Sequence, residues 1–135
     1  MENRATLLRR TLFANGVVTL LFGALLLVDH ARIAALVGVA EGPVVVAGAI
    51  CVAFAPVLFL AARKRELSTQ AAALLVAVDG AWVAGSFVVA AAAPLTGFGR
   101  ALLVAQAGLV GVFMVLETAG IRRRQASGVE RAVDF

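Results

Sequence analysis

Residues 71–93 read AAALLVAVDGAWVAGSFVVAAAA, an apolar run in which Asp79 is the single ionisable side chain. A helix of about 20 mostly apolar residues crosses the hydrocarbon core of a bilayer, which is roughly 30 Å thick. The run lacks the continuous polar face that a helix on the surface of a soluble protein shows. It therefore predicts a transmembrane helix over residues 71–93.

Three further runs have the same character, at residues 12–28, 44–62 and 101–121. The chain has 135 residues, of which 62% are hydrophobic and 15% charged, whereas soluble domains carry about 25% charged residues. This composition excludes a soluble globular enzyme and a disordered chain. The predicted fold class is all-α: a polytopic membrane protein in which residues 1–121 form an antiparallel bundle of four transmembrane helices.

The segments between the runs are short and carry helix-breaking or capping residues. Pro94 and two glycines predict a turn over residues 94–99, and Ser68 or Thr69 is the expected N-cap of the third span. Residues 33–39 are apolar but too short to cross a bilayer, so we expect either a short interfacial helix or an extended loop there. Residues 122–135 are expected to form a basic, flexible tail.

The cationic residues lie mainly in three of the five segments outside the spans. Of the twelve Lys and Arg residues, only Arg32 and Arg100 fall in the other two segments. Short cytoplasmic loops are the ones that carry such an excess of cations. The asymmetry predicts a multi-pass protein of the bacterial inner (cytoplasmic) membrane with both termini in the cytoplasm.

The same cations are candidates for contacts with anionic lipid head groups, where each is worth about 1 kcal/mol. The alternative is that they only fix the topology. The net charge of +4 does not indicate nucleic acid binding, because the charges are separated by the apolar runs. The residues expected at lipid head groups are Arg9, Arg10, Arg63, Lys64, Arg65, Arg122, Arg123 and Arg124.

The residues that usually carry catalysis or bind metals are scarce. Cys51 is the single cysteine and His30 the single histidine, so the chain offers neither an internal disulfide nor a pair of histidine ligands for haem. A metal-binding histidine motif and a nucleotide-binding glycine motif are also missing from the sequence. We therefore expect no enzymatic activity, no metal and no cofactor.

Polar residues inside the spans are the remaining candidates, since ionisable groups are costly in a membrane and often functional. Residues three or four apart share a face of a helix, and this spacing groups the polar residues of the first, third and fourth spans. We expect the three faces to point inward and to form one intramembrane polar cluster. Its members are Asn15, Thr19, Asp79, Trp82, Ser86, Gln106 and Glu117.

Two interpretations of this cluster remain open. In the structural one, Asp79 accepts hydrogen bonds from Asn15 or Thr19, each worth on the order of 0.6–2 kcal/mol. In the functional one, Asp79 and Glu117 form a proton or cation site with Trp82 near it. Glu117 is expected to be the weaker member of this site, because the arginines at 122–124 lie one turn away, near enough to neutralise its charge.

The chain resembles uncharacterised small bacterial four-helix integral membrane proteins. The resemblance covers most of the chain and implies a fold and a membrane location, but no activity. It is carried by two loose motifs, Asn15-x-x-x-Thr19-x-x-x-Gly23 in the first span and Asp79-x-x-Trp82-Val83-x-x-Ser86 in the third.

The small residues on the helix faces, the short loops and the missing catalytic groups favour a non-enzymatic protein that acts through helix–helix contacts. It would be an accessory subunit of a larger membrane complex or a self-associating bundle, that is, a homo-oligomer. The alternative function is a small proton-coupled carrier or a ligand-binding bundle with its intramembrane acid at Asp79.

Overall fold

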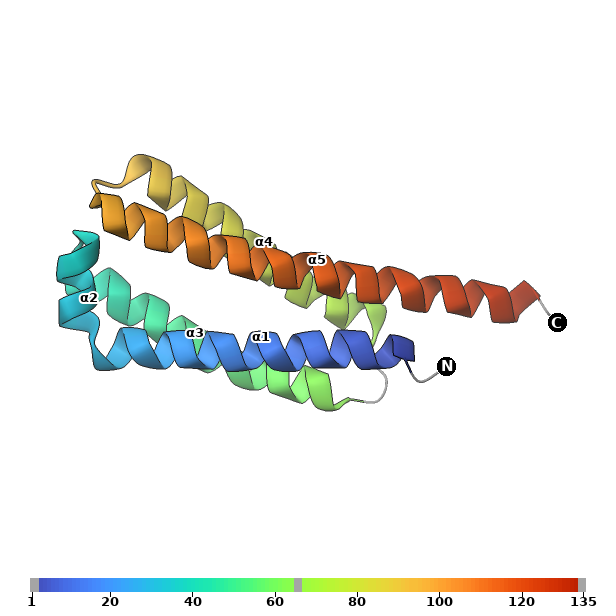
Figure 1. Cartoon of the computed structure of the whole chain (residues 1–135). Helices are drawn as coiled ribbons and strands as arrows, with labels where there is room; N and C mark the ends of the chain where they lie inside the picture. Colours follow the sequence, from blue (N-terminus) through green and yellow to red (C-terminus); the bar gives the residue numbers. More distant parts are fainter. Residues whose placement is uncertain (1–2, 65–66, 134–135) are drawn as a thin grey trace.

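The computed structural model describes residues 3–64 and 67–133, and the side chains of residues 6–64 and 67–123. These ranges form five helices and no strand: α1 (Asn3–Val28), α2 (His30–Val37), α3 (Glu41–Arg63), α4 (Thr69–Ala92) and α5 (Gly97–Val133) (Figure 1). All except α2 are long and apolar enough to cross a membrane, and they pack antiparallel. The prediction of an all-α chain with four membrane-spanning helices is confirmed.

The four long helices form two hairpin-like pairs, α1 with α3 and α4 with α5, which are joined by packing between α1 and α5. In contrast, α3 and α4 make almost no contact with each other. The two pairs draw apart toward the end that carries α2 and the α4–α5 turn (Figure 1). The bundle is therefore closed at the end of the two termini and open along the side between α3 and α4.

Glycines allow α1 and α3 to pack closely. A Cβ atom added to Gly23 would lie 2.7 Å from Cys51 Cβ and 2.9 Å from the carbonyl oxygen of Gly48. A Cβ added to Gly48 would in turn lie 3.0 Å from the carbonyl oxygen of Gly23. Small residues permit such close approach of helix backbones in membranes, where packing and not the hydrophobic effect drives helix association.

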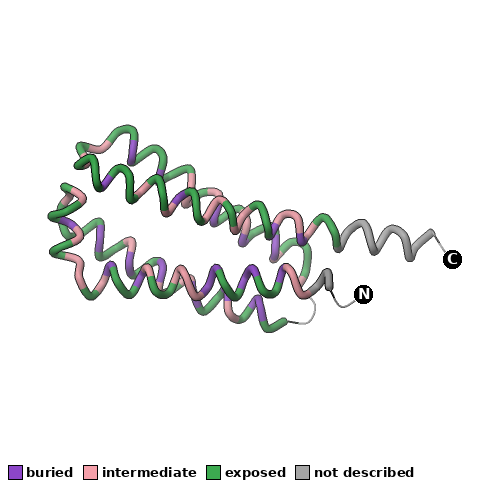
Figure 2. Tube along the Cα trace, in the orientation of Figure 1, coloured by how far each residue is buried: buried purple, intermediate pink, exposed green. Residues whose placement is uncertain are grey.

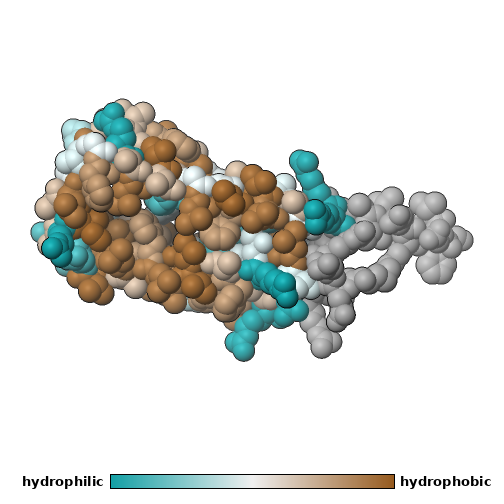
Figure 3. Space-filling view, in the orientation of Figure 1, coloured by the Kyte–Doolittle hydropathy of each residue, from teal (hydrophilic) through white to brown (hydrophobic). Residues whose placement is uncertain are grey.

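An apolar core holds the closed end of the bundle together. It joins residues of α1, α3 and α4, namely Leu8, Leu12, Leu58, Ala61, Ala62 and Leu75. Large apolar side chains elsewhere are exposed, for example Leu21, Leu74 and Val88, each at 65%. Figure 2 shows buried positions between the helices, and Figure 3 shows a mostly apolar surface across the middle of the face in view. Such an apolar surface is what four membrane-spanning helices present to lipid.

The short helix expected near residues 33–39 is present as α2, and it ends at Gly38, whose φ of 85° is left-handed. Thr96 connects α2 to the start of α5: its backbone N–H donates to the carbonyl of Val37 (2.9 Å) and its hydroxyl donates to the carbonyl of Leu36 (2.6 Å). Gly99 allows this contact, because a Cβ there would lie 2.6 Å from the Val37 oxygen. The α2 helix is thus fixed across the open end of the bundle.

The helix boundaries refine the predicted ones. Ser68 is the N-cap of α4 and accepts a hydrogen bond from the N–H of Ala71 (3.1 Å), as one of the two expected caps. The turn before α5 is shorter than predicted, because α5 already begins at Gly97. The predicted tail continues α5 as far as Val133, since residues 122–126 (RRRQA) are good helix formers.

Candidate functional site

One asparagine joins two acids from two other helices. The Asn15 side-chain amide on α1 donates to Asp79 Oδ2 on α4 (2.8 Å) and to Glu117 Oε1 on α5 (3.1 Å). Thr19 Oγ1, one turn along α1, donates to Asn15 Oδ1 (3.2 Å). The exposed fractions of Asn15, Asp79 and Glu117 are 1%, 5% and 0%. Both N–H bonds of the amide are therefore used, each on one oxygen of a buried carboxyl group.

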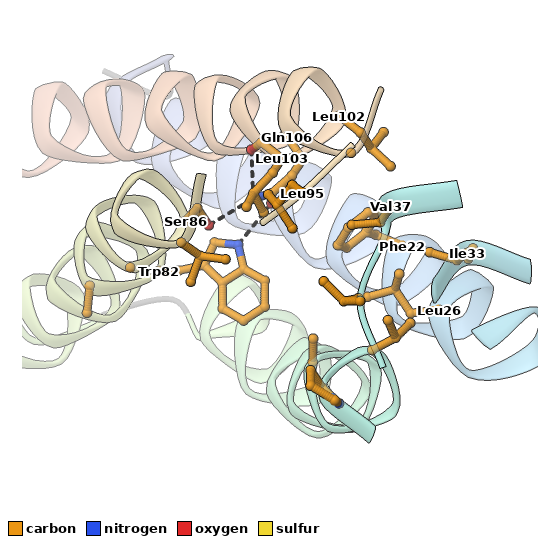
Figure 4. A pocket seen from close by; sticks show the side chains of 18 residues that line it. Phe22, Leu26, Ile33, Val37, Trp82, Ser86, Leu95, Leu102, Leu103 and Gln106 are labelled. Carbon is orange, nitrogen blue, oxygen red and sulfur yellow. Dashed lines mark hydrogen bonds between the residues drawn. The ribbon is translucent and has the colours of Figure 1, made fainter. Parts of the chain in front are cut away.

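A second network links α4 and α5 nearer to α2. The indole N–H of Trp82 donates to Gln106 Oε1 (2.9 Å), and Gln106 Nε2 donates to Ser86 Oγ (2.9 Å) and to the carbonyl of Leu103 (3.1 Å) (Figure 4). These bonds fix the Trp82 ring in one orientation, directed toward the space between the helices (Figure 4). The seven residues expected in one polar cluster thus lie in two adjacent networks.

Two cavities adjoin these networks. The first, here called the α2-side cavity, has a volume of about 400 Å³ and is lined by residues of all five helices. Its wall is apolar apart from Trp82, Ser86 and Gln106. The second, here called the central cavity, has a volume of about 380 Å³ and is lined by Thr19, Asp79, Trp82 and Gln106 among apolar residues of α1, α3, α4 and α5.

The two cavities are neighbours that share part of their wall. Phe22, Ala81, Trp82 and Gln106 line both of them. The space exists because α3 does not pack against α4, and because the residues facing it there, such as Ala47, Ala81 and Gly85, are small. Trp82 thus belongs to the wall of both cavities, whereas Asp79 lines only the central one.

The two acids have no cationic partner in the described part of the chain. The ion pair found there, His30 Nε2 with Glu41 Oε2 at 3.3 Å, joins the first residues of α2 and α3 and is partly exposed. Glu117 Oε2 is buried and accepts no hydrogen bond. Glu117 Oε1 accepts the Asn15 bond, and Arg122 and Arg123, two of the arginines expected to lie one turn from Glu117, are exposed.

Of the residues expected at lipid head groups, those that the structure describes lie at the end of the molecule that holds both termini. Arg9, Arg10, Arg63 and Lys64 are exposed there, and Figure 3 shows hydrophilic side chains at this end as well as at the opposite one. Arg9 also donates from Nε to the carbonyl of Ala62 (2.9 Å). Arg65 and the side chain of Arg124 lie outside the described residues.

Chemically, the arrangement combines an apolar space, an aromatic ring held by hydrogen bonds, and a carboxyl group at the wall. Cys51 is buried and lines the central cavity. No group of three or more His, Cys, Asp or Glu in the described ranges is placed to hold a metal ion.

The chain matches no protein-family model, no curated protein and no solved structure.

Proposed function

We propose that this protein is a ligand-binding membrane protein that holds a small, largely apolar molecule in the cavities between its helices. The observation that carries the proposal is the α2-side cavity, whose apolar wall is interrupted only by the hydrogen-bonded Trp82, Gln106 and Ser86. Ligand sites are typically mostly apolar cavities of about 300–1,000 Å³ with a few fixed polar groups. The cavity of about 400 Å³ falls in that range.

The ligand would reach the cavities from the bilayer. The absence of close packing between α3 and α4 leaves the bundle open between these two helices beyond the core at the end of the two termini. At the end nearer α2, Thr96 binds α2 to the start of α5, and Ile33 and Val37 of α2 form part of the cavity wall there. A molecule that already partitions into lipid therefore has the shortest path to Trp82.

Tryptophan fluorescence tests this proposal, because Trp82 is the only tryptophan and the chain has no tyrosine. The probe is 4-bromoneopentylbenzene, an uncharged lipophilic molecule whose bromine quenches indole emission on contact. We expect saturable quenching in purified protein. Quenching that rises linearly with probe concentration, as collision in the micelle would give, contradicts the proposal.

A cavity-filling variant and a matched control locate the probe. Gly85 lines the α2-side cavity, and a Cβ there meets no atom within 4 Å, so Gly85→Leu adds a side chain at the wall whose Cβ has free space. Gly108 has the same free space but lines neither cavity. We expect Gly85→Leu to weaken quenching at least tenfold and Gly108→Leu to leave it unchanged.

The location and topology belong to the same proposal. The cationic residues at the end with both termini support a bacterial inner-membrane protein with cytoplasmic ends, whose exposed arginines bind anionic head groups. Replacing Arg122 and Arg123 by Gln should lower the amount of anionic lipid that copurifies with the protein. Unchanged retention would leave these residues a role in topology only.

A second candidate function is the one favoured by the sequence, action through helix–helix contacts as an accessory subunit or a homo-oligomer. It is supported by Gly108 and Gly111 on α5, where a Cβ would meet no atom within 4 Å, so another helix has room to approach closely. Mass measurement in several mild detergents tests it. A monomer free of other proteins in all of them contradicts it.

A further inference from the structure

The central cavity brings an acid to the wall of an apolar space without a compensating charge. Asp79 lines this cavity together with Thr19 and Trp82. Its Oδ2 accepts the bond from Asn15, and no ion pair to it exists in the described ranges. An ionised carboxylate in such surroundings is stable only when a cation or enough hydrogen-bond donors face it.

The hydrogen bonds indicate where protons lie when the cavity is empty. Asn15 donates to one oxygen of each acid, and Glu117 Oε2 faces no donor although the residue is fully buried. A charged oxygen without a donor at this depth is the costliest arrangement, whereas a protonated carboxyl group still accepts the Asn15 bond through its carbonyl oxygen. The geometry is that of two neutral acids held by one amide.

The two acids differ in whether they can be reached from a cavity. Asp79 lines the central cavity, whereas Glu117 lines neither cavity. A ligand group in the cavity therefore reaches Asp79 and not Glu117. The neighbouring Trp82 presents an aromatic face at the same wall, and aromatic faces attract organic cations.

We infer that the ligand is an organic monocation with an apolar body, and that Asp79 exchanges its proton for the cationic group of the ligand. This inference rests on the proposed ligand-binding function and names the ligand class. The apolar body occupies the α2-side cavity against Trp82, and the cationic group lies in the central cavity at Asp79. Glu117 keeps its proton throughout.

The exchange conserves charge at the site. When the cation enters, the O–H bond of Asp79 breaks, the proton passes to water, and the new carboxylate faces the cation. The other titratable groups near Asp79 are Glu117 on α5 and Cys51 on α3, while α1 contributes the neutral Asn15 and Thr19. One proton is thus released for each cation bound.

The test compares 4-bromobenzyltrimethylammonium with 4-bromoneopentylbenzene, which differs from it only by carbon in place of the charged nitrogen. We expect the cation to quench Trp82 at concentrations at least tenfold lower than the uncharged isostere. In the pH range in which Asp79 is protonated in the empty protein, the affinity of the protein for the cationic probe should rise up to tenfold for each unit by which the pH is raised. Titration in weakly buffered solution should release one proton per bound cation, and none for the isostere.

Two conservative variants assign the exchange to one acid. Asp79→Asn keeps the hydrogen bond from Asn15 but cannot release a proton, so we expect it to bind the cation no better than the isostere, independently of pH. Glu117→Gln should bind the cation with wild-type pH dependence. The comparison of the two probes on the wild-type protein needs no variant and decides the question even if Asp79→Asn does not fold.

The outcomes separate this inference from the proposed function. Saturable quenching by both probes with equal affinity and no proton release overturns the cation inference and leaves the ligand-binding function standing. Saturable quenching by neither probe overturns both. Wild-type cation binding by a folded Asp79→Asn protein also overturns the inference, because the charge would then act elsewhere.

Discussion

Asn15 Nδ2 lies 2.8 Å from Asp79 Oδ2, and this hydrogen bond connects α1 with α4. Apart from α5, no helix packs extensively against α4. The bond therefore helps to hold α4 in place beside the open side of the bundle, where α3 does not pack against it. Because the same amide also binds Glu117, Asn15 is the point at which three membrane-spanning helices are joined by polar contacts.

Replacing Asn15 by leucine, which has a similar size and no donor, should destabilise the protein more than any other single change in this network. It leaves two buried carboxyl groups without their donor, which costs at least about 2 kcal/mol. Thr19→Val is the control, since it removes only the 3.2 Å bond to Asn15 and should cost less than about 1 kcal/mol. Unfolding in detergent followed by circular dichroism measures both. Equal stability of the two variants would show that the bridge is unimportant.

The contact between α1 and α3 gives a steric prediction. Gly23→Val places a branched side chain where a Cβ alone lies 2.7 Å from Cys51 Cβ and 2.9 Å from a backbone oxygen, so the helices must separate. We expect a loss of more than about 3 kcal/mol, as for severe overpacking of a core. Gly108→Val has no such neighbours and should remain as stable as the wild-type protein. A stable Gly23→Val protein would mean that α1 and α3 are farther apart than described.

Thr96 provides a third prediction, about the attachment of α2. Its hydroxyl accepts the N–H of Gly99 (3.0 Å) at the start of α5 and donates to the carbonyl of Leu36 (2.6 Å). Thr96→Val removes both bonds and should cost about 1–2 kcal/mol, as the loss of an N-cap does, with faster hydrogen exchange of the α2 amides. Thr118→Val loses only a bond within its own helix, to Met114, and serves as the control. Unchanged exchange in α2 would contradict the role given to Thr96.

Much of the fold follows from features visible in the sequence. Length and hydropathy identify the four long helices, and Ser68 marks the start of α4 because its hydroxyl accepts an N–H of the first turn. The spacing of Asn15, Asp79 and Glu117 places each on the inward face of its helix, and the structure joins them through hydrogen bonds. Polar residues in lipid are informative because they need a partner.

The cavities were not predictable in the same way. An apolar residue facing lipid and one facing another helix look alike in a sequence, because lipid chains are as apolar as leucine. Nothing in the apolar runs of α3 and α4 therefore indicates that they fail to pack together. Glycine is equally ambiguous: Gly23 allows a close helix contact, whereas a Cβ at Gly85 or Gly108 would meet no atom within 4 Å. The contact of Thr96 with α2 joins residues far apart in the chain, and no local pattern reports it.

The proposed topology gives the last prediction, which uses cysteines placed in the two kinds of loop. In a Cys51→Ala background, Gly42→Cys lies beside α2, where a Cβ meets no atom within 4 Å, and Ser68→Cys lies at the opposite end, before α4. A cytoplasmic location of both termini puts residue 42 outside and residue 68 inside. A membrane-impermeant maleimide added to intact cells should therefore label Gly42→Cys and spare Ser68→Cys until the membrane is opened. An even number of spans places both termini on the same side of the membrane as residue 68. Labelling of Ser68→Cys in intact cells would therefore show that both ends of the chain lie on the outer face. The arginines near both ends would then lie outside the cell, contrary to the rule that short cytoplasmic segments carry the excess of Lys and Arg, on which the proposed orientation is based.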